Sequence, residues 1–117
     1  MKLLEMSEAQ IFEVAEPILK NAIAGARDKN WDLFSKYMPI EDSSNDELKA
    51  NVEKQWQEGT YLTAFSRKFD FLGVIRKPER ILVVFRLTST LSKEEYLEKL
   101  YLEERDGKIV QAGIWTE

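Results

Sequence analysis

The sequence predicts an α+β domain in which N-terminal helices pack on a curved, mainly antiparallel four-stranded sheet. Two observations support this fold class. Up to about residue 59 the apolar residues recur every three or four positions, which is typical of amphipathic helices. From residue 61 onward apolar and polar residues tend to alternate, and turn-forming residues at 77–80 and 106–107 divide this half of the chain into strands.

The first helix is expected to begin at Ser7 and to run for roughly 20 residues. Ser7 and Gln10 have the spacing of a capping box. Apolar residues then recur along one side of the helix, at Ile11, Val14, Ile18, Ala22 and Ala26. Pro17 lies inside this pattern and removes one backbone hydrogen bond, so we expect it to kink the helix.

Two further helices are expected before the strands. Asn30 can cap a short helix over residues 31–38, which Pro39 would end. Residues 44–47 form a second capping box, with acidic residues in the first turn where the helix dipole favours them. Leu48, Val52 and Trp56 mark the buried side of this last helix, and Gly59 has the position of its C-terminal cap.

The first two strands are expected over residues 61–72 and 81–88. In the former, alternate positions are mainly aromatic, and Gly73 after it indicates a bulge or a bend. In the latter, the odd positions are all apolar, so that side must face the core. They are Ile81, Val83, Phe85 and Leu87.

Asp106 and Gly107 predict a type I′ turn between two last strands, residues 96–105 and 108–116. Pairing outward from this turn sets Leu102 opposite Gln111, Tyr101 opposite Ala112, Leu100 opposite Gly113 and Glu98 opposite Trp115. One face then contains Leu100, Leu102, Ile109 and Trp115, and the other contains Leu97, Tyr101, Val110, Ala112 and Ile114. Neither face is polar, so both should be covered. Helices can cover one, and a second subunit would cover the other, which predicts a homodimer through the sheet face.

Composition excludes several classes of protein. The 117 residues fit one domain, 1–117, and a net charge of −4 provides no basic footprint for nucleic acid. Without histidine and cysteine, the Ser-His and Cys-His nucleophile systems and thiolate chemistry are excluded. We expect no cofactor, metal site or membrane segment, because their motifs and the long apolar run are missing. A cytoplasmic protein is expected.

Asp70 and Arg86 are the charged candidates for a site. Asp70 lies between two phenylalanines; pointing inward it would be desolvated and could act as a base, and pointing outward it would be an ordinary solvated residue. Arg86 could hold an anionic ligand, or it could pair with Glu98 or Glu103 on a neighbouring strand.

Aromatic residues are the candidates for a ligand pocket. They come from elements that should converge on one cavity, although large aromatics also fill ordinary cores. The set is Trp31, Tyr37, Trp56, Tyr61, Tyr101 and Trp115.

The order of elements, three helices followed by a bent strand and three more antiparallel strands, resembles the nuclear-transport-factor-2-like superfamily, which has a cystatin-like cone fold. Residues 29–34 (KNWDLF) look like the turn into the family's second helix. Residues 101–110 (YLEERDGKIV) look like its last hairpin. The resemblance implies a frequent dimer through the sheets and a pocket between helices and sheet. The superfamily includes isomerases, dehydratases and non-enzymatic binders. The Asp-His pair that its dehydratases use is excluded here, because the chain has no histidine.

We therefore expect a non-catalytic dimeric module that binds a small apolar ligand or a protein partner in or near the cavity. The alternative is a small cofactor-independent isomerase or cyclase, with Asp70 as general base and Tyr37 or Tyr101 as proton donor. A third possibility is a purely structural partner-binding domain, which would have a filled cavity.

Overall fold

The computed structural model describes residues 2–59 and 61–117 and confirms the predicted α+β class. A long helix, α1 (Glu8–Asp28), is followed by α2 (Trp31–Phe34), α3 (Ile40–Ser43) and α4 (Asp46–Gln57). Short 3-10 turns lie at Leu3–Glu5 and Tyr61–Thr63. The strands are β1 (Asp70–Arg76), β2 (Ile81–Thr88), β3 (Glu95–Arg105) and β4 (Lys108–Thr116). Each pairs antiparallel with the next, in the order β1-β2-β3-β4.

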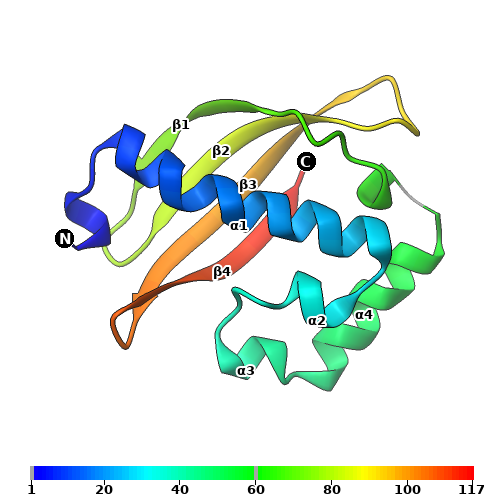
Figure 1. Ribbon diagram of the computed structural model, residues 1–117, viewed down its shortest axis with the longest axis horizontal. Coiled ribbons are helices and arrows are strands. Elements are labelled where there is room, and N and C mark those ends of the chain that lie inside the picture. The colour runs from blue at the N-terminus through cyan, green and yellow to red at the C-terminus, as the bar shows by residue number, and fades with distance from the viewer. Residues whose placement is uncertain (1, 60) are drawn as a thin grey trace.

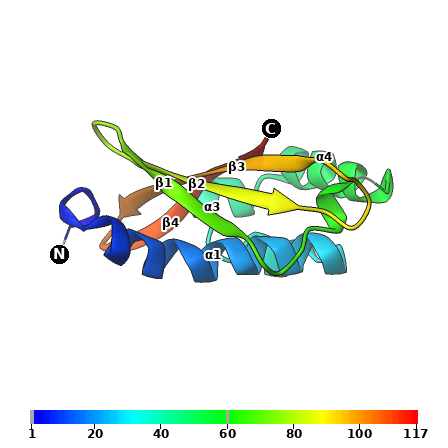
Figure 2. The same ribbon diagram turned by 90° about the horizontal axis from the view of Figure 1, so that it is seen from above.

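The helices are not spread evenly over the sheet. Helix α1 crosses one face diagonally, whereas α2, α3 and α4 lie beyond the edge strand β4 (Figure 1). Seen along the sheet, no described helix lies over the opposite face, which we call the outer face (Figure 2). The cover of the sheet by helices is therefore one-sided, and the two sides of β4 have different surroundings.

Helix α1 begins and ends as local chemistry dictates. The predicted capping box is present: the Ser7 hydroxyl accepts from the Gln10 backbone N–H, and the Gln10 side chain accepts from the Ser7 N–H. Lys29 ends the helix in the left-handed conformation, with φ 52°. The helix continues through Pro17. Pro17 and Glu13 are both exposed, so water can reach the carbonyl that Pro17 leaves without a partner.

The core has two parts. The larger lies between α1 and the sheet, and the predicted buried side of β2 is confirmed there by Ile81, Val83, Phe85 and Leu87. The smaller lies among α1, α2 and α4, around Ala26, Trp31 and Trp56.

Gly25 allows the close approach of α1 and α2. A Cβ atom at this position would lie 2.6 Å from the Cα atom of Phe34, so a side chain there would push the two helices apart. Only glycine lacks that atom.

The strand predicted over residues 61–72 is wrong for residues 61–69. Tyr61–Thr63 form a 3-10 turn, Phe65 makes an isolated bridge with Ser89, and β1 begins only at Asp70. The Tyr61 ring stacks on Tyr96 at 4.3 Å, and the Tyr61 carbonyl accepts from the Ser89 hydroxyl. These contacts fold the segment over the end of the sheet. Its apolar residues alternate as in a strand, but the segment does not form a continuous ladder with β2. The bulge at Gly73 is confirmed by a register shift between Phe71 and Gly73.

The last hairpin has the predicted turn but a different register beyond it. Asp106 and Gly107 both have positive φ, as type I′ requires, and Leu102 lies opposite Gln111. A bulge between Tyr101 and Leu102 then sets Tyr101 opposite Gly113 rather than Ala112. Leu100 lies opposite Ile114 rather than Gly113, and Glu98 lies opposite Thr116 rather than Trp115.

The bulge reverses the two faces of the end of β4. Ile114 packs against the core, while Trp115 lies on the outer face opposite Lys99, with its ring 6.2 Å from that of Tyr101. The Trp115 ring also covers Gly113, where a Cβ would lie 3.1 Å from it. The predicted grouping of Trp115 with Leu100 and Leu102 is therefore wrong, because one extra residue inverts every following side chain.

Candidate functional site

A cleft of about 750 Å³ lies between β4, the C-terminal half of α1 and the helix α4. Residues 111–116 of β4 line it without a gap, so it meets the edge of this strand as well as one face. Its walls are mainly apolar and include Ala22, Ile23, Ala26, Val52, Trp56 and Ile114. The cleft separates the two parts of the core.

Glu98 is the buried carboxyl group of this cleft. It lies on the core side of β3 with the buried residues Tyr96, Leu100 and Leu102, and only 3% of its surface is exposed. Desolvation raises the pKa of Glu98 from 4.5 to about 7, against the smaller opposing effect of a hydrogen bond from the Thr116 hydroxyl to Glu98 Oε1, 2.7 Å long. Near neutral pH Glu98 is therefore divided between its protonated and ionised forms.

Gln111 is the second buried polar side chain of the cleft. Its backbone N–H donates to the carbonyl oxygen of Tyr37 at 2.7 Å, which ties the edge of β4 to the segment after α2. The residue is 1% exposed, yet its Oε1 atom has no hydrogen-bond partner among the described residues. A buried acceptor without a partner costs about 1–3 kcal/mol. A ligand donor in the cleft would remove that cost.

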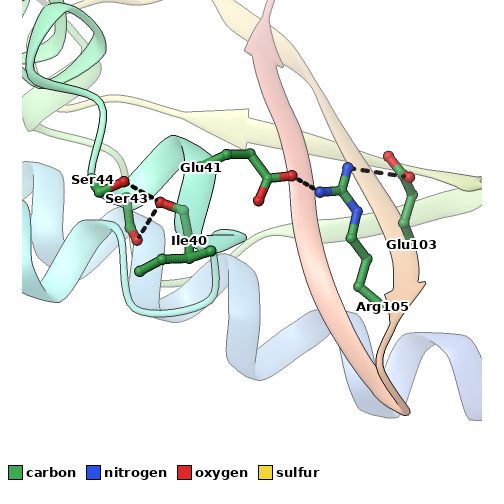
Figure 3. A network of polar contacts seen from close by, with 6 residues as sticks. All are labelled: Ile40, Glu41, Ser43, Ser44, Glu103 and Arg105. Atoms are coloured by element: carbon green, nitrogen blue, oxygen red, sulfur yellow. Dashed lines mark hydrogen bonds and ion pairs between the residues drawn. The ribbon is translucent and has the colours of Figure 1, made fainter.

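Helix α3 is held beside the cleft by a polar network. Glu41 of α3 forms an ion pair with Arg105 of β3, and Arg105 also reaches Glu103 at 3.5 Å (Figure 3). On the other side, the Ser43 and Ser44 hydroxyls donate to the Ile40 carbonyl. The network positions the next residue, Asp42, which lines the cleft.

The six aromatic candidates do not converge on one cavity. Trp56, Tyr61 and Trp115 are among the residues that line the cleft. Trp31 is buried in the smaller core and donates through Nε1 to the Ser43 carbonyl. Tyr37 packs against the larger core, and Tyr101 lies on the outer face.

Asp70 and Arg86 both lie outside the cleft. They face each other across β1 and β2 and form an ion pair with a distance of 3.0 Å between Nε and Oδ2. The Asp70 side chain is 64% exposed, so it lacks the desolvation that a base of raised pKa requires. Arg86 is in a cross-strand pair of the kind expected, but its partners are Asp70 and Glu95, not Glu98 or Glu103.

Glu98 and Gln111 were not among the predicted site residues, although the sequence held a signal for each. Glu98 alternates with Leu100 and Leu102, which the pattern had already assigned to one face. Gln111 was predicted, and is confirmed, to lie opposite Leu102. A polar residue in register with a buried row is a candidate for a site.

The described residues, 2–59 and 61–117, contain no group of three or more acidic side chains placed to hold a metal ion. Within the same ranges, no helix has the length and the apolar composition needed to cross a membrane.

No protein-family model matches the chain, and no curated protein matches it. Among solved structures, the solution structure of a SEC-C motif containing protein from Rhodopseudomonas palustris is similar over 79% of this chain and 70% of that chain. The sequence identity is 18% and the TM-score is 0.46, and a similarity of this size supports no conclusion about function.

Proposed function

We propose that this chain is a non-catalytic, nuclear-transport-factor-2-like module that binds a small, largely apolar ligand in the cleft beside β4. The order of helices and strands supports the family assignment, together with a pocket between helices and sheet. Fold alone does not choose among the functions of such a family, so the proposal depends on the site.

The cleft is the observation on which the ligand proposal rests. Its volume of about 750 Å³ is within the range of small-molecule sites, which are mostly apolar with a few polar groups that fix orientation. Glu98 and Gln111 supply such polar groups from the sheet. A core that needed no ligand would be expected to fill this space and to satisfy the Gln111 oxygen.

The proposal includes a homodimer through the outer face. That face exposes Ile75 by 49% and Trp115 by 56%. Trp115 lies beside the half-buried Tyr101, and Ile75 lies opposite Leu82, which in turn lies opposite Tyr101. A second copy of the chain would bury these side chains, because the interface of a symmetric dimer uses the same patch twice.

The alternative of an isomerase or cyclase with Asp70 as base has little support. Asp70 is exposed, paired with Arg86 and separated from the cleft by the sheet. We therefore do not propose catalysis by Asp70.

Native mass spectrometry of gently purified protein tests the ligand proposal, with Nile red fluorescence as a second readout. We expect a reproducible small-mass adduct, or saturable Nile red binding after the adduct is removed. Gln55→Trp should abolish both, because Gln55 is exposed on α4 and lines the cleft.

Gln57→Trp is the matched control, since Gln57 is exposed on the same helix and is not among the cleft residues. Equal binding by the two tryptophan variants, or no binding by the unmodified protein, would refute a ligand site in the cleft.

A further inference from the structure

The ionisable side chains in the described lining of the cleft are all acidic. Its titratable side chains, among the described residues, are Asp42, Tyr61 and Glu98, and none of its described lining residues is a lysine or an arginine. The unsatisfied atom of Gln111 is also an acceptor. The cleft therefore offers carboxylate and carbonyl oxygens, and no cation of the lining balances them.

Glu98 lacks the partner that a buried carboxyl group normally has. Charged side chains are almost never fully buried unless they are paired. The Thr116 hydroxyl of β4 donates to Glu98, and Phe85 of β2 lies opposite Glu98 in the sheet. Helix α1 lines the same cleft with apolar residues such as Ala22 and Ala26.

The two basic side chains of α1 do not line the cleft. The Arg27 guanidinium donates to the carbonyl oxygen of Phe65, Lys20 pairs with Glu16, and both line a separate groove. Across the cleft, α4 contributes Trp56. The described lining residues therefore supply no counterion for Glu98, and the cleft leaves room for a ligand to supply one.

Aromatic rings form part of the same walls. Phe34, Trp56 and Tyr61 line the cleft together with the carboxyl groups of Asp42 and Glu98. Aromatic faces attract organic cations, and the attraction increases where water is excluded. An ammonium group can thus be received by ring faces and a carboxylate, while an anion would meet the carboxyl groups of Asp42 and Glu98 with no lysine or arginine among the described lining residues.

We propose that the cleft binds an organic cation, an amine or ammonium group on an elongated apolar body, with its charge against Glu98. This inference rests on the proposed function and names the chemical class of its ligand. Gln111 would accept from a donor at the other end of the ligand. Leu102, the cross-strand partner of Gln111, is four residues beyond Glu98 on β3. At about 3.3 Å per residue, Glu98 and Gln111 are therefore separated by roughly 13 Å along the strand.

Binding of a cation requires ionised Glu98, so it should depend on pH. Since the pKa of free Glu98 is about 7, a bound ammonium displaces a proton from any Glu98 that is still protonated. The ammonium remains charged throughout this range. The apparent affinity should therefore rise about tenfold from pH 6 to pH 8, with proton release at the lower pH.

Titration calorimetry with hexylamine, hexanol and hexanoate tests the proposal, because the three share one apolar chain and differ in charge. At pH 8 we expect hexylamine to bind at least tenfold more tightly than hexanol, and hexanoate to bind least. Glu98→Gln should reduce the affinity for hexylamine to that for hexanol, whereas Glu98→Asp should keep the preference. Glu95→Gln is the control, because Glu95 is exposed on the same strand.

The outcomes separate this inference from the proposed function. Equal binding of hexylamine and hexanol, or a preference for hexylamine that persists in Glu98→Gln, would overturn the cation site and leave an apolar ligand pocket. Binding of none of the three, with no Nile red binding, would overturn both. Circular dichroism and thermal unfolding establish that each variant is folded.

Discussion

At the scale of single residues, Glu98 shows what burial does to a carboxyl group when no cation compensates it. The hydrogen bond from Thr116 favours the charged form, but desolvation outweighs it and raises the pKa to about 7. Between about pH 4.5 and pH 7 the folded state therefore holds a proton that the unfolded chain has already lost.

This difference in protonation predicts a pH-dependent stability. The contribution of Glu98 is fully present below about pH 4.5 and is lost as the pH rises through about 7, at most roughly 3 kcal/mol in free energy of unfolding. Glu98→Gln should remove this loss, so the variant gains stability relative to the unmodified protein between pH 5 and pH 8. Urea unfolding at several pH values measures it.

Glu95→Gln serves as the reference for that experiment, since Glu95 is exposed and its carboxylate stays hydrated in the folded state. A stability difference between Glu98→Gln and the unmodified protein that does not change with pH would contradict a raised pKa. The chain has no histidine, so no imidazole titration obscures this range.

At the scale of elements, α3 depends on few contacts, and the Arg105 pair with Glu41 links it to the sheet. Because both side chains are more than one-third exposed, the pair should contribute less than about 1 kcal/mol to global stability. Arg105→Ala should instead loosen α3 locally. We expect faster amide exchange over residues 40–44, with the unfolding midpoint nearly unchanged, as measured by hydrogen exchange and mass spectrometry.

Lys20→Ala provides the comparison, because it breaks an exposed ion pair with Glu16 that lies on α1 alone. Exchange in α3 that is as slow in Arg105→Ala as in Lys20→Ala would mean that the pair does not hold this helix.

Among the elements, those determined by local interactions were predicted from the sequence, and those that depend on distant contacts were not. Capping chemistry and the Asp106 turn are local, so α1 and the last hairpin were predicted. The bulge in β4 is not local, because it depends on how Trp115 packs over Gly113 and against Tyr101. The 3-10 turn at Tyr61 likewise depends on stacking with Tyr96, which is distant in the sequence. Asp70, the predicted base, lies outside the cleft, whereas Glu98, on the predicted buried face of β3, lines it.

At the scale of the whole molecule, the one-sided cover of the sheet leaves the outer face for a second copy. Trp115→Glu should convert the proposed dimer into a monomer, since it buries a charge against an apolar partner surface. Size-exclusion chromatography with light scattering measures the mass. Leu91→Lys is the control, because Leu91 is exposed by 61% in the loop between β2 and β3. A monomeric unmodified protein at every concentration would refute the dimer.

The sheet order β1-β2-β3-β4 also has a consequence for how the chain folds. Every strand pairs with its neighbour in sequence, so the ladders can form one after another from local contacts, beginning at the tight turn of Asp106 and Gly107. Helix α1 and the turn before it should pack on the sheet late, after the rate-limiting step, because their partners are distant: Met6 accepts from Arg76, and Leu3 donates to Glu104. Substitutions in the last hairpin should therefore change mainly the rate of folding, and those on the buried side of α1 mainly the rate of unfolding.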